Sequence, residues 1–249
     1  MNRAVNTSMR LFAESFDPPG PVIELGSFYP PGWEELADLR RYFPGREYIG
    51  CDIRPGLGVD RIEDAENLSF EDGTAGTVLI CDMLPHTPHP DRVASEVLRI
   101  LKPGGLLATS AAFHFRINGF PTDYYRFTAS GLYTLLEGFD ARRVFALGPR
   151  VLPRFAFAVA AKEPDDRYSA SVRRFEERVH DAFRRTRFHA YVNELAASGR
   201  ELLGCLLGRA ELGAAFYDPE SAGGYLDDAL VRPGSAAPRD REEAEGRER

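Results

Sequence analysis

Two short apolar runs constrain the fold of this chain most, because each ends in a residue with special chemistry. Residues 22–27 read Val-Ile-Glu-Leu-Gly-Ser, and residues 48–53 read Tyr-Ile-Gly-Cys-Asp-Ile. Gly26 lets a ligand approach the backbone closely, since it has no Cβ. Asp52 stands where doubly wound proteins hold the two hydroxyls of a ribose. The pair predicts a nucleoside-bearing ligand over the carboxyl ends of parallel strands. The alternative is a parallel α/β protein whose first strand simply ends in glycine.

The residues after Gly26 narrow the kind of ligand. The pyrophosphate of a dinucleotide requires a Gly-x-Gly-x-x-Gly turn that opens a helix. Here Phe28 and Tyr29 would crowd a diphosphate, and Pro30 and Pro31 lack the amide donors that it needs. S-adenosylmethionine has a ribose and an adenine but no phosphate, so one close backbone approach and one acid suffice. The sequence therefore favours S-adenosylmethionine over a nicotinamide dinucleotide.

Strand-like and helix-like segments alternate through residue 161. This alternation predicts an α/β fold with a Rossmann-like, doubly wound, mostly parallel sheet. We expect strands at 22–27, 48–53, 59–62, 77–81 and 106–110, and helices at 6–16, 33–42, 92–101 and 128–138. Two further strands, at 142–147 and 154–161, are expected to form an antiparallel pair at the edge of the sheet.

The chain divides into three predicted regions. Residues 1–163 form the ligand-binding domain, in which segment 6–16 is a short lid helix. Residues 164–231 form a C-terminal helical appendage, because their apolar residues recur at helical spacing and a second helix is expected at 191–207. Residues 232–249 are polar and charged, and we expect them to be disordered.

Charge and cysteine content limit the partners and the compartment. The net charge of −7 at pH 7 argues against a nucleic-acid backbone as the main partner. The first residues lack a continuous apolar core, and no run approaches the length of a bilayer span, so neither a signal peptide nor a membrane is expected. Cys51, Cys81 and Cys205 have no metal-like spacing, which predicts free thiols in the cytoplasm.

Several strings between residues 22 and 162 carry a resemblance to a known family. Besides the two strands around Gly26 and Asp52, they are Cys-Asp-Met-Leu-Pro-His at 81–86 and Leu-Lys-Pro-Gly-Gly at 101–105. The chain resembles class I S-adenosylmethionine-dependent methyltransferases, in the small Rossmann-like group often labelled methyltransferase type 11. Segment 121–128, Pro-Thr-Asp-Tyr-Tyr-Arg-Phe-Thr, resembles an Asp-Tyr-Trp-Arg-Phe-Thr segment of one subset of that group.

The chain also departs from the family pattern. The glycine-rich first loop is reduced to Gly26 and Ser27, a form that the same subset shares. Pro85 replaces the acid expected before His86, and Tyr125 replaces a tryptophan. These departures leave the fold prediction intact and weaken the assignment of a base.

The resemblance implies a set of residues that contact S-adenosylmethionine. They are Glu24, Gly26, Ser27, Asp52, Ile53, Asp64, Ala65, Cys81 and Met83. Glu24 and Gly26 would lie by the methionine part, and Ser27 would offer its amide or hydroxyl. Asp52 would hold the ribose hydroxyls, with a solvent-facing helix cap as the alternative. Asp64 would meet the adenine, with a turn-forming role as the alternative. Residues 81–83 would line the far side of the cofactor.

Two histidines are candidates for a base that removes a proton from a hydroxyl or amine acceptor. His86 and His114 both follow the carboxyl ends of predicted strands. The alternative for each is a hydrogen-bonded structural histidine. The predicted border of the acceptor pocket is Asp123, Tyr124 and Arg126. The tyrosines of that segment have core packing as their alternative. No Cys/His cluster or carboxylate set indicates a metal site.

The expected activity is methyl transfer from S-adenosylmethionine to a small molecule, with a bacterial secondary metabolite as the expected acceptor. O-methylation is the first hypothesis, and N- or C-methylation stays open. One rival is a methyltransferase-fold protein with a binding or non-methylating role, since fold alone does not define function. A second rival is a nicotinamide oxidoreductase. The C-terminal helices are a candidate homodimer face, with an ordinary solvated surface as the alternative.

Overall fold

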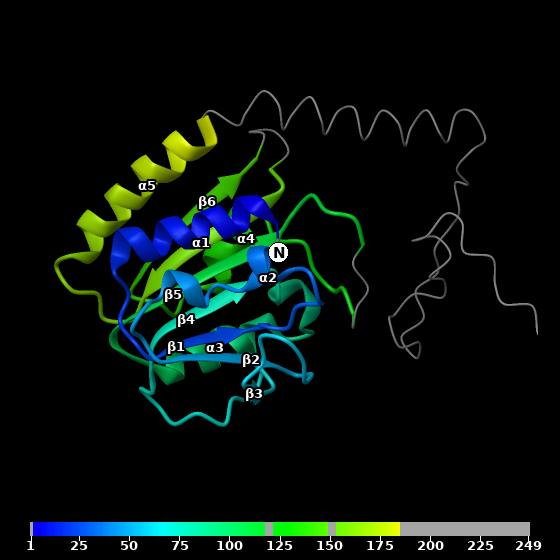
Figure 1. The fold of residues 1–249 in the computed structure, drawn as a ribbon. Helices are drawn as coiled ribbons and strands as arrows, with labels where there is room; N and C mark the ends of the chain where they lie inside the picture. The colour runs from blue at the N-terminus through cyan, green and yellow to red at the C-terminus, as the bar shows by residue number, and fades with distance from the viewer. Residues whose placement is uncertain (1, 118–121, 149–152, 185–249) are drawn as a thin grey trace, which may run out of the picture.

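The structure, a computed structural model, describes residues 2–117, 122–148 and 153–184 (Figure 1). Its centre is a seven-stranded sheet in the order β3-β2-β1-β4-β5-β7-β6. The strands are β1 (Val22–Leu25), β2 (Tyr48–Asp52), β3 (Arg61–Ile62), β4 (Ala75–Cys81), β5 (Leu101–Ala112), β6 (Ala141–Leu147) and β7 (Phe155–Ala161). Strands β1 to β5 pair in parallel, whereas β7 is antiparallel to both β5 and β6. The predicted Rossmann-like sheet with an antiparallel edge is confirmed.

The central strands are apolar along their whole length because both faces of the sheet are covered. Every residue of β1 is buried, and so is every residue of β4 except Cys81. A helix or a loop crosses a face of the sheet between successive parallel strands, so the carboxyl ends of β1, β2 and β4 meet at one edge.

The helices are α1 (Arg3–Phe16), α2 (Glu34–Ala37), α3 (Pro90–Ile100), α4 (Ala129–Leu135) and α5 (Tyr168–Arg184), with short 3-10 turns η1 (Arg40–Tyr42) and η2 (Leu84–His86). Helices α3 and α4 pack on one face of the sheet, and helices α1 and α5 pack on the other (Figure 1). On one face, Val97 of α3 and Leu132 of α4 pack in one cluster with Ile80 of β4. On the other face, α1 and α5 lie side by side over the sheet.

The single helix predicted over residues 33–42 is wrong. The segment contains the short α2 and then η1, and Asp38 between them has an extended backbone. The Asp38 carboxylate accepts a hydrogen bond from the amide of Arg40 at 3.0 Å. An aspartate that bonds to a nearby amide competes with the helix for that amide, which explains the break.

The strand predicted at 106–110 begins earlier than expected. β5 starts at Leu101, which pairs with Ala75 before the register shifts. Gly104 and Gly105 also belong to this strand, and they exchange backbone hydrogen bonds with Lys162 at 2.8 and 3.0 Å. Gly104 has a φ of +76°, a conformation that favours glycine. The Pro-Gly-Gly string therefore follows the end of α3 as an irregular part of β5 rather than as a loop.

Helices α1 and α5 share one core. Phe12 of α1 and Phe175 of α5 pack with Leu79 of β4 and Phe157 of β7. No residue of α1 lines the cavity described below, so its role as a lid stays a prediction without support from its position. The predicted helix at 191–207, Cys205 and the predicted tail at 232–249 lie outside the described residues. The division of the chain at residue 163 likewise stays a prediction.

Within the part of the chain that the structure describes, no helix combines the length and the apolar character needed to cross a bilayer.

We predict that α5 contributes to folding stability through Phe175. Its side chain is 1% exposed, and its ring lies 6.0, 5.4 and 5.7 Å from those of Phe16, Phe145 and Phe157. Phe175→Ala should lower the unfolding free energy in urea by about 3–5 kcal/mol. The control Arg173→Ala, on the exposed face of α5, should change it by less than about 0.5 kcal/mol. Equal effects of the two substitutions would contradict a core role for α5.

Candidate functional site

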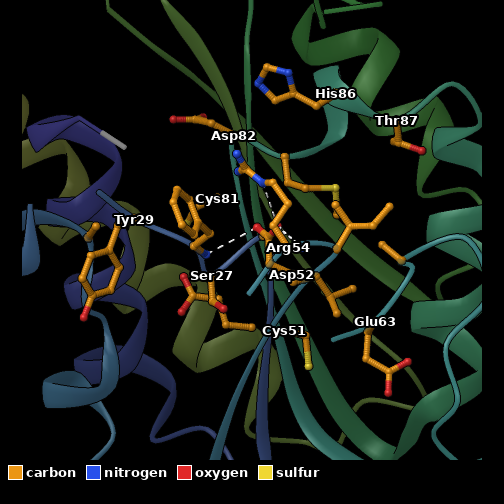
Figure 2. A pocket seen from close by; sticks show the side chains of 18 of the residues that line it. Ser27, Tyr29, Cys51, Asp52, Arg54, Glu63, Cys81, Asp82, His86 and Thr87 are labelled. Carbon is orange, nitrogen blue, oxygen red and sulfur yellow. Dashed lines mark hydrogen bonds and ion pairs between the residues drawn. The ribbon is translucent and has the colours of Figure 1, made fainter. Parts of the chain in front are cut away.

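A cavity of about 320 Å³ opens at the carboxyl ends of β1, β2 and β4 (Figure 2). Its lining includes every residue that the sequence assigned to the cofactor, namely Glu24, Gly26, Ser27, Asp52, Ile53, Asp64, Ala65, Cys81 and Met83. These residues are far apart in the sequence, and the parallel strands bring them to one edge of the sheet. The structure therefore assembles the predicted set in one place.

The turn after β1 depends on glycine at position 26. Gly26 has a φ of +80°, and a Cβ placed there would lie 2.8 Å from Cβ of Met83. The amides of Gly26 and Ser27 both donate to the carbonyl oxygen of Cys51, at 2.8 and 3.0 Å. The Ser27 amide is therefore already used, whereas its buried hydroxyl has no hydrogen-bond partner among the described residues. Of the two groups predicted for Ser27, the amide is bonded to the protein and the hydroxyl is buried away from the cavity surface.

Glu24 is a buried carboxyl group in the wall of the cavity. The hydroxyl of Tyr48, on the adjacent strand β2, donates to its Oε2 at 2.7 Å. Burial raises the pKa of Glu24 to about 7, and the Tyr48 hydrogen bond and the charge of Arg40 oppose this rise. Cys81 lies in β4, the neighbour of β1 on the side away from Tyr48. Burial and the Glu24 carboxyl raise the pKa of its thiol. Glu24 thus titrates near neutral pH beside an uncharged thiol.

Asp52 is the last residue of β2 and is turned into the site rather than into solvent. Its side chain is 10% exposed. The carboxylate accepts hydrogen bonds from the Arg54 amide at 3.0 Å, from Arg54 Nε at 3.3 Å and from the Phe28 amide at 3.4 Å (Figure 2). The next residues form bends and turns, so the helix-cap alternative for Asp52 is wrong. The Arg54 guanidinium lies 4.3 Å from the centre of the Phe28 ring.

The first loop has few glycines, but the loop after β2 contains two, Gly56 and Gly58, that pack against it. A Cβ at Gly56 would lie 2.4 Å from Cε2 of Phe28, and one at Gly58 would lie 2.6 Å from Cε1 of Tyr29. Both aromatic rings therefore occupy space that only glycine leaves open. This packing accommodates the bulky residues after Gly26, which still line the cavity together with Trp33 and Pro30.

Asp64 and its neighbours form the side of the cavity near β3. Asp64 accepts a hydrogen bond from the amide of Glu66 at 2.9 Å, so it does form the turn considered as its alternative role. It also lines the cavity, together with Ala65 and Ile53. The two readings of Asp64 are therefore compatible.

The two candidate bases lie in different places. His86, in η2, lines the cavity, and its Nδ1 contacts the carbonyl oxygen of Thr122. A carbonyl oxygen only accepts hydrogen bonds, so Nδ1 carries the proton in this contact. His114 is exposed, does not line the cavity, and donates its amide to the carbonyl oxygen of Arg154 at 3.2 Å. The position of His86 supports its predicted role, whereas that of His114 gives no such support.

None of the three predicted acceptor residues lines the cavity. The Asp123 side chain is 2% exposed and forms an ion pair with Arg126, with Oδ2 and Nη2 2.6 Å apart. Arg126 also donates to the carbonyl oxygen of Arg116 at 3.0 Å, and the Tyr124 amide donates to that of Pro85 at 2.7 Å. These contacts hold the segment beside η2, and an acceptor-binding role for Asp123, Tyr124 and Arg126 stays a prediction.

Asp82 and Arg54 also line the cavity (Figure 2). Asp82 was expected only as part of segment 81–83 along the far side of the cofactor, and Arg54 had no predicted role. The signal for Asp82 was present, because it is the charged residue directly after the apolar run of β4. Arg54 lacked such a signal, since its contact with Phe28 depends on two loops that meet only in the fold. Among the described residues, no group of three or more His, Cys, Asp or Glu side chains can hold a metal ion.

Comparisons with known proteins identify the class. Residues 34–109 match the family described as Methyltransferase domain. No curated protein matches the chain. A solved S-adenosylmethionine-dependent methyltransferase from Archaeoglobus fulgidus is 17% identical, with a TM-score of 0.51 over 64% of this chain and 93% of its own. The 1,6-didemethyltoxoflavin-N1-methyltransferase of Burkholderia thailandensis is 16% identical, with a TM-score of 0.50 over 66% of this chain and 79% of its own.

Segment 34–109 therefore matches a methyltransferase domain, and the described residues have the fold of class I methyltransferases, which confirms the resemblance seen in the sequence. The match supports an S-adenosylmethionine-dependent methyltransferase with S-adenosylmethionine as its cofactor. The cavity fits this group. Its lining combines the turn at Gly26, whose φ of +80° favours glycine, with the nearly buried carboxylate of Asp52.

We predict that Glu24 makes folding stability depend on pH. Its pKa rises from 4.5 to about 7 in the folded protein. Between these values the unfolded chain ionises first, so the contribution of Glu24 to stability falls as the pH rises. Glu24→Gln removes the titration and keeps an acceptor for Tyr48. Its unfolding free energy relative to wild type should therefore increase by about 2 kcal/mol from pH 5 to pH 8 in urea titrations. A difference that is constant with pH would contradict a raised pKa.

Proposed function

We propose that this methyltransferase transfers the methyl group of S-adenosylmethionine to an oxygen atom of a small-molecule acceptor. The observation that carries the proposal is the single cavity that joins the cofactor residues at β1 and β2 to His86 after β4. When bound, S-adenosylmethionine supplies a methyl group already activated by a positive sulfur. The protein then has to align the acceptor with that methyl group and exclude water.

The cofactor is proposed to lie across the ends of three strands. Its methionine part lies by Glu24 and Gly26, its ribose hydroxyls by Asp52, and its adenine by Asp64 and Ala65. This order follows the sheet from β1 through β2 to β3. Asp52 is already held by the Arg54 and Phe28 amides, so its carboxylate needs little reorganisation to accept the ribose hydroxyls.

His86 is proposed as the general base. With its proton on Nδ1 and directed at Thr122, the other ring nitrogen has a lone pair that can accept the proton of an acceptor hydroxyl. Proton removal of this kind contributes about 10²–10⁴-fold to a rate. His114 is the second candidate, and it would require a movement of the segment after β5 to reach the cavity.

A small acceptor is supported by charge. The net charge of −7 disfavours nucleic acid as the acceptor. A neighbour in fold is named for the methylation of a small heterocycle. The expectations of a secondary metabolite, a cytoplasmic location and a homodimer through the C-terminal helices rest on the sequence alone.

A methyltransferase-fold protein with a binding or non-methylating role is the second candidate. The observation that favours it is the first loop, in which the amides of both Gly26 and Ser27 are bonded to Cys51. This loop therefore offers a bound ligand fewer backbone donors than a glycine-rich loop does.

Calorimetric titration separates the candidates by the ligand that binds. We expect binding of S-adenosylhomocysteine and none of NADH. Asp52→Ala should weaken S-adenosylhomocysteine binding by about 1–3 kcal/mol, because the ribose loses a charged acceptor. The control Asp72→Ala removes an exposed carboxylate outside the cavity lining and should leave affinity unchanged. Binding of NADH alone would support an oxidoreductase, and binding of neither ligand would contradict a cofactor-dependent role.

Transfer of a labelled methyl group tests the chemistry. The wild-type protein, with methyl-labelled S-adenosylmethionine, is offered a panel of phenols, alcohols, amines and activated carbon acids. We expect label on oxygen, with a rate that falls by about 10²–10⁴-fold in His86→Gln. The variant His114→Gln is the matched control and should retain the rate. Label on nitrogen or carbon would overturn O-methylation, and an unchanged rate in His86→Gln would exclude it as the base.

A further inference from the structure

We propose that the carboxylate of Asp82 faces the sulfonium and the transferring methyl group of the bound cofactor, and that it selects S-adenosylmethionine over the demethylated product. This inference rests on the proposed function, because it requires the cofactor to lie across the cavity as described. It gives the charge of Asp82 a specific role, whereas the resemblance placed residues 81–83 only along the far side of the cofactor.

The position of Asp82 follows from the pairing of the strands. β1 and β4 are parallel neighbours with Leu25 opposite Ile80, and Asp82 comes directly after the end of β4. The next residue, Met83, lies against Gly26 so closely that a Cβ on the glycine would meet its Cβ at 2.8 Å. Asp82 therefore stands next to the turn at the proposed methionine end of the cavity.

Asp52 lies on the opposite side of β1. The strand order is β2-β1-β4, so the carboxylates of Asp52 and Asp82 belong to strands that flank β1. Both residues line the cavity (Figure 2). In S-adenosylmethionine the sulfur atom joins the methionine chain to the ribose. If the ribose lies at Asp52 and the methionine part at Gly26, the sulfur lies near the carboxyl end of β1, which is the strand next to β4 and therefore next to the turn that holds Asp82.

The side chain of Asp82 is held in place from β5. Its φ is +55°, in the left-handed region that aspartate enters more readily than most residues. The amide of Asp82 donates to the carbonyl oxygen and the hydroxyl of Ser110, each at 3.1 Å. The Ser110 hydroxyl in turn donates to Oδ1 of Asp82 at 2.7 Å. One serine thus fixes both the backbone turn and the direction of the carboxylate.

The surroundings of Asp82 leave its charge poorly solvated. Burial raises its pKa, while the Ser110 hydrogen bond and the nearby His86 lower it. The Cys81 thiol is uncharged because burial raises its pKa, as do the neighbouring Glu24 and Asp82 carboxyl groups. A cation beside a poorly solvated carboxylate gains more electrostatic energy than one in water. The sulfonium is such a cation, and the thioether of S-adenosylhomocysteine is neutral.

Paired affinities of the two ligands test the proposal without any acceptor. Calorimetry measures the dissociation constants of S-adenosylmethionine and S-adenosylhomocysteine for the full-length protein and its variants. Asp82→Asn keeps the shape and an acceptor for Ser110 but removes the charge. We expect it to weaken S-adenosylmethionine binding by about tenfold or more and to change S-adenosylhomocysteine binding by less than about twofold.

The matched control is Asp64→Asn, which removes one carboxylate from the proposed adenine side of the same cavity. Adenine is common to both ligands, so this variant should change the two affinities by the same factor. Equal effects of Asp82→Asn on the two ligands, or no effect on either, would overturn the proposal. Wild-type protein that binds neither ligand would instead contradict the proposed function itself.

A pH series extends the test to variants that keep Asp82. The wild-type ratio of the two affinities should shift in favour of S-adenosylmethionine as the pH rises and Asp82 ionises. Ser110→Ala removes a hydrogen bond that lowers the pKa of Asp82, so the midpoint of this shift should move to higher pH. His86→Gln should keep the shift, which separates Asp82 from the imidazole. An unmoved midpoint in Ser110→Ala, or a shift lost in His86→Gln, would assign the effect to another group.

Discussion

The close contact between Gly26 and Met83 is the constraint on which the site depends. It brings the turn after β1 against the turn after β4, with no room for a Cβ between them. The turn after β1 is also tied to β2, because the Gly26 and Ser27 amides share the carbonyl oxygen of Cys51. Three neighbouring strands are thereby joined at their carboxyl ends. The predicted cofactor residues lie in these three strands, directly after them, or directly after β3. Their arrangement therefore depends on the contacts that hold the strand ends together.

Glycines in the loop after β2 make room for the bulky side chains of the first loop. Phe28 and Tyr29 need space that a glycine-rich loop would not require, and Gly56 and Gly58 provide it. The Arg54 guanidinium over the Phe28 ring then binds the two loops together. A cation over an aromatic face contributes about 0.5–2 kcal/mol, depending on its exposure. The same arginine donates to Asp52, so loop packing and the orientation of that carboxylate are coupled.

The fold, and the gathering of the predicted cofactor residues around one cavity, followed from the sequence because both depend on local pattern. Apolar runs that end in glycine or aspartate define strand ends, and parallel strands bring such ends together. The break at Asp38 was missed because a side-chain hydrogen bond overrode an apparent helical pattern. His114 could not be placed from its distance past β5 alone. The path of that segment depends on tertiary contacts, among them the buried pair of Asp123 and Arg126.

Two carboxyl groups with raised pKa values in one cavity are unfavourable for folding alone. Burial removes water from the carboxyl groups of Glu24 and Asp82. The charged form of each is therefore less favourable in the folded state, and the pKa of each is raised. Such groups are retained where a ligand supplies the missing charge, because binding to the folded state alone stabilises it. S-adenosylmethionine carries two positive groups, an ammonium on its methionine part and the sulfonium beside its ribose. In the binding mode that we propose, the carboxyl groups of Asp82 after β4 and Glu24 within β1 lie near these two positive groups, so the residues that weaken the empty fold would be stabilised by the cofactor.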